Sequence, residues 1–242
     1  STLAREYGCK AYDNYGDLIA DDQIDAVYIP LPNGLHAEWV TKALQHGKHV
    51  LCEKSLACSQ AEAIQMVDVA TKNNLALIEN FQFRFHSQLR KLKELIGVDG
   101  TAPSVIGSIR AIRCSFGFPP FPDADNIRYS AKLGGGALLD AGAYTIKAAN
   151  LLFGPTILSG ASLTVDRSRD IDLHGGGLLI SPNTGVTTHL AFGFDHFYQC
   201  GVEVWGSEGV LRTNRLFTAR ASVAPQFEIE SNEKPKQTLA LE

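Results

Sequence analysis

The 242-residue sequence lacks any apolar run that approaches the roughly 20 residues needed to span a membrane. Its first residues also lack the basic-then-apolar pattern of a secretory signal, although a signal upstream of Ser1 would not be visible. We therefore expect no membrane partner and a cytoplasmic location.

Cysteine is scarce, and positive charge is not in excess. The five cysteines form no C-x-x-C pair and no cluster with histidine at metal-ligand spacing, so we expect reduced thiols and no metal site. The 22 Lys and Arg against 26 Asp and Glu give a net charge of -4 and a pI near 6.0. This balance argues against nucleic acid and anionic membranes as partners.

The first third of the chain alternates short apolar runs with helical patterns, which is typical of βαβ units. We expect strands at 26–31, 48–53 and 75–80 in a parallel sheet covered on both faces, because the runs are continuously apolar. Asn33 is the predicted cap of a helix over 34–45 that Gly47 ends, and Ser59 with Glu62 predicts a capping box opening a helix to Lys72. Ligands of such sheets bind beyond the carboxyl ends of the strands. That rule places these residues on one rim: Pro32, Asn33, Glu53, Lys54 and Asn80.

After residue 84 the pattern changes to a helix over 87–96, a strand over 109–115 and a glycine-rich helix over 136–153. Antiparallel strands follow, with turns at 182–185 and 206–209. The predicted fold class is α/β. A partial Rossmann-like parallel sheet (1–83) precedes an α+β domain with an open, mainly antiparallel sheet (84–242).

Three polar residues stand out. Asp140 and Tyr144 lie four residues apart in the glycine-rich helix, which puts them on one face of an α-helix, and Lys54 closes an apolar strand. Together they could pass a proton to or from a hydroxyl or a carbonyl. Taken singly, each fits a structural role better: a surface helix pair or a packed tyrosine, and a solvent-facing lysine paired with Glu53. His36 alone reads as a helix-surface histidine, and Arg128 and Tyr129 as loop residues.

The order of three motifs is more specific than any single residue. Residues 25–36 (DAVYIPLPNGLH), 47–54 (GKHVLCEK) and 134–144 (GGGALLDAGAY) resemble the glucose-fructose oxidoreductase / inositol dehydrogenase (Gfo/Idh/MocA) family, and the resemblance extends to about residue 220. Residues 127–129, 203–209 and 215–218 are most similar to sugar-nucleotide 3-ketoreductases. Dihydrodiol dehydrogenases share part of this pattern. Both groups have tyrosine at the position of Tyr144, where many members have histidine.

The resemblance implies an NAD(P)-dependent oxidoreductase that moves a hydride between nicotinamide and a carbonyl or alcohol carbon of a sugar or sugar nucleotide. It implies NAD or NADP as cofactor, with a slight preference for NADP, and a homo-oligomer formed through the C-terminal sheet. Catalysis would fall to Lys54, Tyr144 and Asp140, and substrate contact to Arg128, Tyr129 and Tyr144. Cofactor contacts are expected from Leu31, Pro32, Asn33, His36, Glu53, Lys54 and Asn80.

Two departures from the family pattern keep alternatives open. No G-x-G-x-x-G turn occurs, so we expect the chain to be part of a longer protein. Ser55 follows Lys54 where relatives have proline, which leaves the Lys54-Ser55 peptide either cis or trans. The alternative functions are a dihydrodiol dehydrogenase and a non-catalytic family member that acts as a binding or scaffold module.

Overall fold

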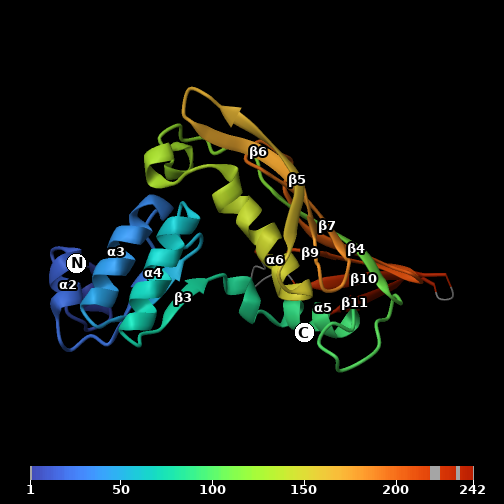
Figure 1. Cartoon of the computed structure of the whole chain (residues 1–242), viewed down its shortest axis with the longest axis horizontal. Helices are drawn as coiled ribbons and strands as arrows, with labels where there is room; N and C mark the ends of the chain where they lie inside the picture. Colours follow the sequence, from blue (N-terminus) through green and yellow to red (C-terminus); the bar gives the residue numbers. More distant parts are fainter. Residues whose placement is uncertain (1, 219–223, 233–234, 242) are drawn as a thin grey trace. The chain divides into compact units, whose positions relative to one another are not determined.

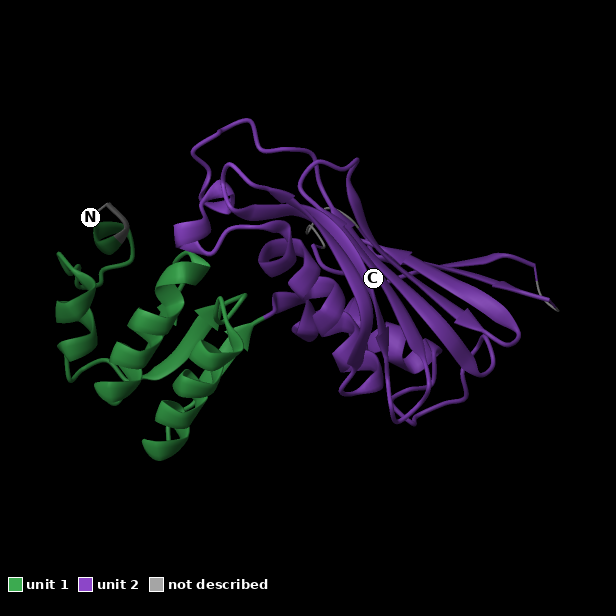
Figure 2. Cartoon of the chain, turned by 45° about the horizontal axis from the view of Figure 1, so that its top comes forward, with its two compact units in different colours: residues 1–80 green, residues 81–242 purple. Residues whose placement is uncertain are grey.

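The chain divides into two compact units, Ser1–Asn80 and Phe81–Glu242 (Figure 2). The structure is a computed structural model that describes residues 2–218, 224–232 and 235–241. Within those ranges no helix is long and apolar enough to cross a membrane. All five cysteines lie in the described ranges as free thiols.

Unit 1 is built on a parallel sheet. Its three described strands follow the order β1-β2-β3, and the helices between them pack on each other and on the sheet (Figure 1). The predicted parallel sheet is confirmed. The elements are α1 Thr2–Glu6, α2 Tyr15–Ala20, β1 Ala26–Ile29, α3 Asn33–Gln45, β2 His49–Glu53, α4 Gln60–Lys72 and β3 Leu77–Asn80.

The prediction that this sheet is covered on both faces is wrong for the described residues. Successive right-handed crossovers in the order β1-β2-β3 put α3 and α4 on the same face. Val27 and Val50 point to that face and are buried, whereas Tyr28 and Ile78 are 52% and 46% exposed. The apolar runs therefore alternate in burial although they do not alternate in hydrophobicity.

The helix ends of unit 1 follow the sequence signals with one exception. The capping box of α4 is confirmed, since Ser59 Oγ accepts from the N–H of Glu62 and the Glu62 carboxylate accepts from the N–H of Ser59. Gly47 ends α3 with φ 75°, as predicted. Asn33 does not cap α3, because Pro32 occupies the extended position before the helix and Asn33 is already its first residue.

In the described part of unit 2, eight strands form one sheet in the order β11-β10-β9-β8-β4-β7-β6-β5. Neighbouring described strands are antiparallel except β4 and β7, which confirms the mainly antiparallel sheet. The helical elements are η1 Gln82–Phe85, α5 Ser87–Leu95, η2 Ile127–Tyr129, η3 Ala131–Leu133, η4 Leu138–Gly142 and α6 Ala143–Phe153. The strands are β4 Ile109–Gly117, β5 Ile157–Asp166, β6 Ile171–Ile180, β7 Thr187–Gly193, β8 Gln199–Gly206, β9 Gly209–Asn214, β10 Gln226–Ser231 and β11 Gln237–Ala240.

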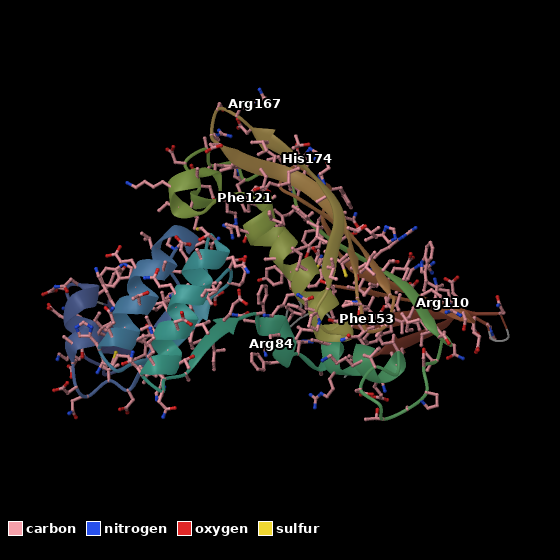
Figure 3. All side chains as sticks on the ribbon, viewed as in Figure 1. Arg84, Arg110, Phe121, Phe153, Arg167 and His174 are labelled. Carbon is pink, nitrogen blue, oxygen red and sulfur yellow. The ribbon has the colours of Figure 1, made fainter. Side chains whose placement is uncertain are left out.

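The two faces of this sheet differ. Helices α5 and α6 lie against one face (Figure 1), where Ile112, Cys114 and Phe116 of β4 are buried with Val202 and Val204 of β8. The residues between them on the strands point to the opposite face. Figure 3 marks Phe153 at the end of α6 and His174 on β6.

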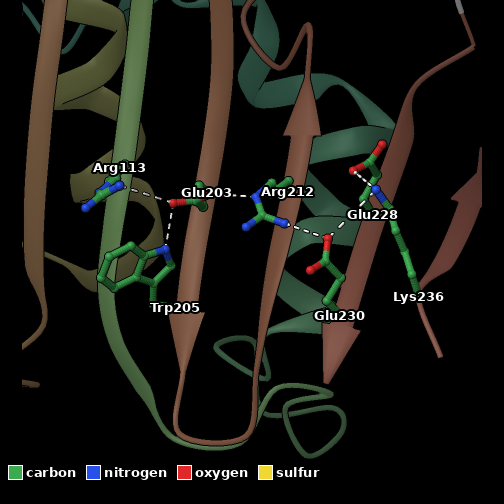
Figure 4. A network of polar contacts seen from close by, with 7 residues as sticks. All are labelled: Arg113, Glu203, Trp205, Arg212, Glu228, Glu230 and Lys236. Carbon is green, nitrogen blue, oxygen red and sulfur yellow. Dashed lines mark hydrogen bonds and ion pairs between the residues drawn. The ribbon is translucent and has the colours of Figure 1, made fainter. Parts of the chain in front are cut away.

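The opposite face carries a ladder of charged side chains across strands β4, β8, β9 and β10 (Figure 4). Glu203 accepts from Arg212 Nε at 2.6 Å and from Trp205 Nε1 at 2.6 Å, and it lies 3.6 Å from Arg113. Arg212 continues to Glu230 at 2.9 Å. Lys236, next to β11, extends the ladder to Glu228 and Glu230, at 2.8 and 3.8 Å.

Candidate functional site

The carboxyl ends of the three strands in unit 1 form a polar rim, defined here as residues 31–33 with Glu53, Lys54 and Asn80. Glu53 Oε1 accepts from Asn80 Nδ2 at 2.7 Å, so the fold brings these two predicted residues together. The same oxygen accepts from the Tyr28 hydroxyl at 2.6 Å. The hydrogen bond to Glu53, with some burial, raises the pKa of Tyr28. The sequence does not single out Tyr28, because tyrosine is a common residue in β-strands and nothing in the strand marks it as a site residue.

The segment after β2 holds Lys54 in a defined backbone conformation. The Lys54-Ser55 peptide is cis, which decides between the two alternatives left open by the sequence. Ser55 is buried, and the N–H of Leu56 donates to Glu79 Oε1 at 3.0 Å. Lys54 itself is half-buried.

His36 has a different place from the one predicted. Its side chain is fully buried. Its Nδ1 lies 2.8 Å from the carbonyl oxygen of Ser55, and its Nε2 lies 2.7 Å from the carbonyl oxygen of Leu31. The alternative that His36 is a helix-surface histidine is wrong, because the side chain is fully buried and both ring nitrogens face backbone carbonyls. Its predicted contact with the cofactor stays a prediction.

The three consecutive glycines at 134–136, in unit 2, each meet a separate steric demand. Gly134 adopts φ 70° and ends η3. A Cβ on Gly135 would lie 2.4 Å from the carbonyl oxygen of Arg128, and one on Gly136, at φ 105°, would lie 2.3 Å from Asp172 Oδ1. Asp172 Oδ2 in turn accepts from the N–H of Leu138 at 2.6 Å. The glycines thus allow the start of the helix to lie against both the preceding loop and β6.

The helix that follows is not regular. Residues Leu138–Gly142 form a π-helical turn, and the α-helix begins only at Ala143, so the predicted α-helix over 136–153 is wrong in its first part. A π turn has more residues per turn than an α-helix, and such turns are frequent at functional sites. Asp140 lies in this turn and Tyr144 in α6. The i to i+4 relation of an α-helix therefore does not describe the pair.

Asp140 is joined to Arg128 by a short ion pair. Arg128 Nε donates to Asp140 Oδ2 at 2.6 Å, with the two side chains 36% and 15% exposed. The Arg128 guanidinium lies 4.7 Å from the ring centroid of Phe121, which Figure 3 labels and which lies in the loop between β4 and η2. The hydroxyl of Tyr129, in η2, accepts from the N–H of Phe121 at 3.0 Å. The sequence named Arg128 and Asp140 separately but did not pair them.

Tyr144 is half-buried in an aromatic cluster. Its ring centroid lies 5.3 Å from Phe81, 5.8 Å from Phe83, 5.1 Å from Phe116 and 5.8 Å from Phe217. The ammonium of Lys147, one helical turn further on, lies 5.1 Å from the Phe81 ring centroid. The sequence does not predict this cluster, because the four phenylalanines lie in segments that are far apart along the chain and share no periodic spacing.

The side chains described above include proton donors and acceptors. Among the described residues no group of three His, Cys, Asp or Glu could hold a metal ion. Burial raises the pKa of Cys52, next to Glu53, to about 12, so this thiol stays protonated near neutral pH.

Two family models match the chain. Residues 1–81 match "Oxidoreductase family, NAD-binding Rossmann fold" and residues 90–212 match "GFO/IDH/MocA C-terminal domain". The chain belongs to the Gfo/Idh/MocA oxidoreductase family. The resemblance drawn from the three motifs is confirmed.

Similar proteins include two named dTDP-3,4-didehydro-2,6-dideoxy-alpha-D-glucose 3-reductase. The one from Streptomyces violaceoruber is 42% identical over 228 residues, 94% of this chain and 65% of the relative. The one from Actinomadura kijaniata is 42% identical over 236 residues, 97% of this chain and 69% of the relative. This Gfo/Idh/MocA chain thus spans about two thirds of the length of these relatives.

A solved structure and a more distant relative complete the comparison. The crystal structure of KijD10, a 3-ketoreductase from Actinomadura kijaniata in complex with NADP and TDP-benzene, superposes with a TM-score of 0.90 at 41% identity. The superposition covers 99% of this chain and 72% of the KijD10 chain. The trans-1,2-dihydrobenzene-1,2-diol dehydrogenase of Xenopus laevis is 35% identical over 144 residues, 60% of this chain and 42% of the relative.

Proposed function

We propose that the protein is an NADP-dependent ketoreductase that reduces the C3 carbonyl of a dTDP-linked deoxysugar, or runs the reverse oxidation. The observation that carries this proposal is the similarity of almost the whole chain to the 3-reductases, at 42% identity, with Tyr144 on a glycine-opened helix. The dihydrodiol dehydrogenase matches a smaller share of the chain, 60%, and is the weaker candidate.

The strand-end rim fits the nicotinamide end of a dinucleotide. Glu53, fixed by Tyr28 and Asn80, offers an acceptor for a ribose hydroxyl. The first N–H groups of α3, at Asn33, lie at the positive end of a helix, next to Leu31 and Pro32. When bound, the cofactor supplies the hydride or accepts it.

In this proposal Tyr144 is the general acid that gives its proton to the substrate oxygen as the carbonyl is reduced. Lys54, on the rim of unit 1, is the second proposed catalytic residue. Asp140, held by Arg128, orients the substrate hydroxyl. The remaining N–H groups of Arg128 and the Tyr129 side chain contribute substrate contacts.

The decisive experiment is Tyr144→Phe in the full-length gene product, assayed with NADPH and a dTDP-linked 3-keto deoxysugar. We expect kcat to fall by about 100-fold or more, because general acid catalysis contributes about 10²–10⁴-fold. Tyr7→Phe is the matched control, since Tyr7 is 74% exposed in unit 1. Turnover of Tyr144→Phe within a few-fold of the wild type would sink the assignment.

A thermal-shift titration with NADPH and NADH separates the enzyme from a scaffold. We expect the full-length protein to be stabilised by NADPH at lower concentrations than by NADH. A full-length protein that neither cofactor stabilises would instead be the non-catalytic binding or scaffold module.

A cytoplasmic location remains part of the proposal and rests on the free thiols.

We also propose that copies of the chain associate through the face of the unit 2 sheet that bears the charge ladder. Its alternating Arg and Glu side chains could pair with the same surface of a second copy. Placing a carboxylate on this face with His189→Asp should lower the mass measured by light scattering, whereas Lys132→Glu, on exposed η3, should not. An unchanged mass for His189→Asp would contradict this interface.

A further inference from the structure

His36 is a fully buried titratable side chain for which the proposed chemistry has no direct use. It is the fourth residue of α3, and it stands between two loops that follow β1 and β2. Both of its ring nitrogens face backbone carbonyl oxygens, that of Ser55 at 2.8 Å and that of Leu31 at 2.7 Å.

The ring of His36 therefore bridges the loop after β1 and the loop after β2. Both of its nitrogens lie within hydrogen-bond distance of a backbone carbonyl oxygen, one in each loop.

The loop that carries Lys54 is therefore held from two sides. His36 binds the carbonyl oxygen of Ser55 from α3. Glu79, from β3, accepts from the N–H of Leu56 at 3.0 Å. Ser55 is the residue next to Lys54, so a shift of its carbonyl moves the backbone of Lys54 as well.

We propose that His36 is the positioning residue that joins the loop of Lys54 to the loop of Leu31, through the two carbonyl oxygens that its ring contacts. The role assigned to Lys54 rests on the proposed function. The anchoring of the loop rests on unit 1 alone.

The test removes the ring nitrogens. His36→Phe keeps a ring without polar atoms and His36→Gln keeps one polar group, while His46→Gln is the control, because His46 is an exposed histidine of the same region. We expect His36→Phe to lower kcat by about 10- to 100-fold, as for a displaced catalytic group, with KM for NADPH changed less than about threefold. His36→Gln should fall between this variant and the wild type.

Hydrogen exchange at the Leu56 amide gives a readout that needs no activity. Loss of the His36 anchor should speed exchange there in His36→Phe, less so in His36→Gln, and not in His46→Gln. Unchanged exchange together with kcat within about twofold of wild type in His36→Phe would overturn the positioning role. If His36→Phe does not fold, the same comparison in His36→Gln decides.

Discussion

The two units fix their candidate site residues by opposite means. In unit 1 the rim is polar: Glu53, Asn80 and Tyr28 share hydrogen bonds, and His36 and Glu79 hold the loop of Lys54 through backbone groups. In unit 2 the ring of Tyr144 is held by four phenylalanines. Hydrogen bonds fix the direction in which a polar side chain points, whereas aromatic packing fixes the position of a ring.

The comparison predicts that unit 2 loses more stability than unit 1 when one site contact is removed. Phe116→Ala deletes a 6% exposed ring that contacts Tyr144, and should cost about 3–5 kcal/mol of unfolding free energy. Urea unfolding in a Trp39→Phe background checks this, because Trp205 then reports on unit 2 alone. Ile78→Ala, at a 46% exposed position of unit 1, is the comparison, measured in a Trp205→Phe background in which Trp39 reports on unit 1. A loss below about 1 kcal/mol for Phe116→Ala would mean that the cluster does not anchor Tyr144.

The glycine motif gives the next largest effect. Gly136→Ala should cost about 2–3 kcal/mol, because the new Cβ would meet Asp172 Oδ1 at 2.3 Å and the backbone stays at φ 105°. Gly160→Ala in β5 is the matched control, since a Cβ there meets nothing within 4 Å. Equal stability of the two variants, measured by the same urea unfolding, would contradict the account of the motif.

The ion pair of unit 2 should affect activity more than stability. Arg128→Gln leaves Asp140 without its 2.6 Å partner, and we expect kcat/KM to fall by about 10-fold, as for a displaced site residue. Steady-state kinetics checks this, with Lys132→Gln in the neighbouring exposed η3 as the control. An Arg128→Gln variant as active as the control would show that Asp140 is positioned without the pair.

The smallest effect is expected at the rim of unit 1. Tyr28→Phe removes one hydrogen bond to Glu53 at a 52% exposed side chain, and should cost less than about 1 kcal/mol. The pKa of Tyr28 is raised from 10.0 by its hydrogen bond to Glu53. Its contribution is therefore complete below the unfolded pKa and is lost as the pH rises through the folded pKa.

Ultraviolet titration of the tyrosines measures that shift directly. We expect Glu53→Gln to lower the pH at which Tyr28 ionises, because the charge and the acceptor that favour the neutral phenol are both weakened. The Tyr28→Phe difference spectrum identifies the signal. If Tyr28 ionises at the same pH in Glu53→Gln as in the wild type, Glu53 does not raise the pKa of Tyr28.

Local signals predicted the elements whose boundaries depend on local chemistry. Ser59 and Glu62 opened α4, Gly47 ended α3, and both predicted hairpin turns lie between strands. Strand β5 had no such signal, because a run of Ile, Leu, Ser, Gly and Ala without alternation identifies no buried face. The π turn at Asp140 was equally invisible, since residues 136–143 are almost all Gly, Ala and Leu and show no apolar face that distinguishes a π turn from an α-helix.

By itself the sequence determined the family and the parallel and antiparallel sheets, and it predicted Lys54, Asp140 and Tyr144 as catalytic residues. Those properties follow from motifs and periodicities that are local along the chain. Only the tertiary structure paired Arg128 with Asp140, gathered four phenylalanines around Tyr144, and placed His36 in the interior of unit 1 against two backbone carbonyls. Each of these contacts joins residues whose proximity depends on how separate elements pack, and that packing is set by the whole core rather than by any one segment.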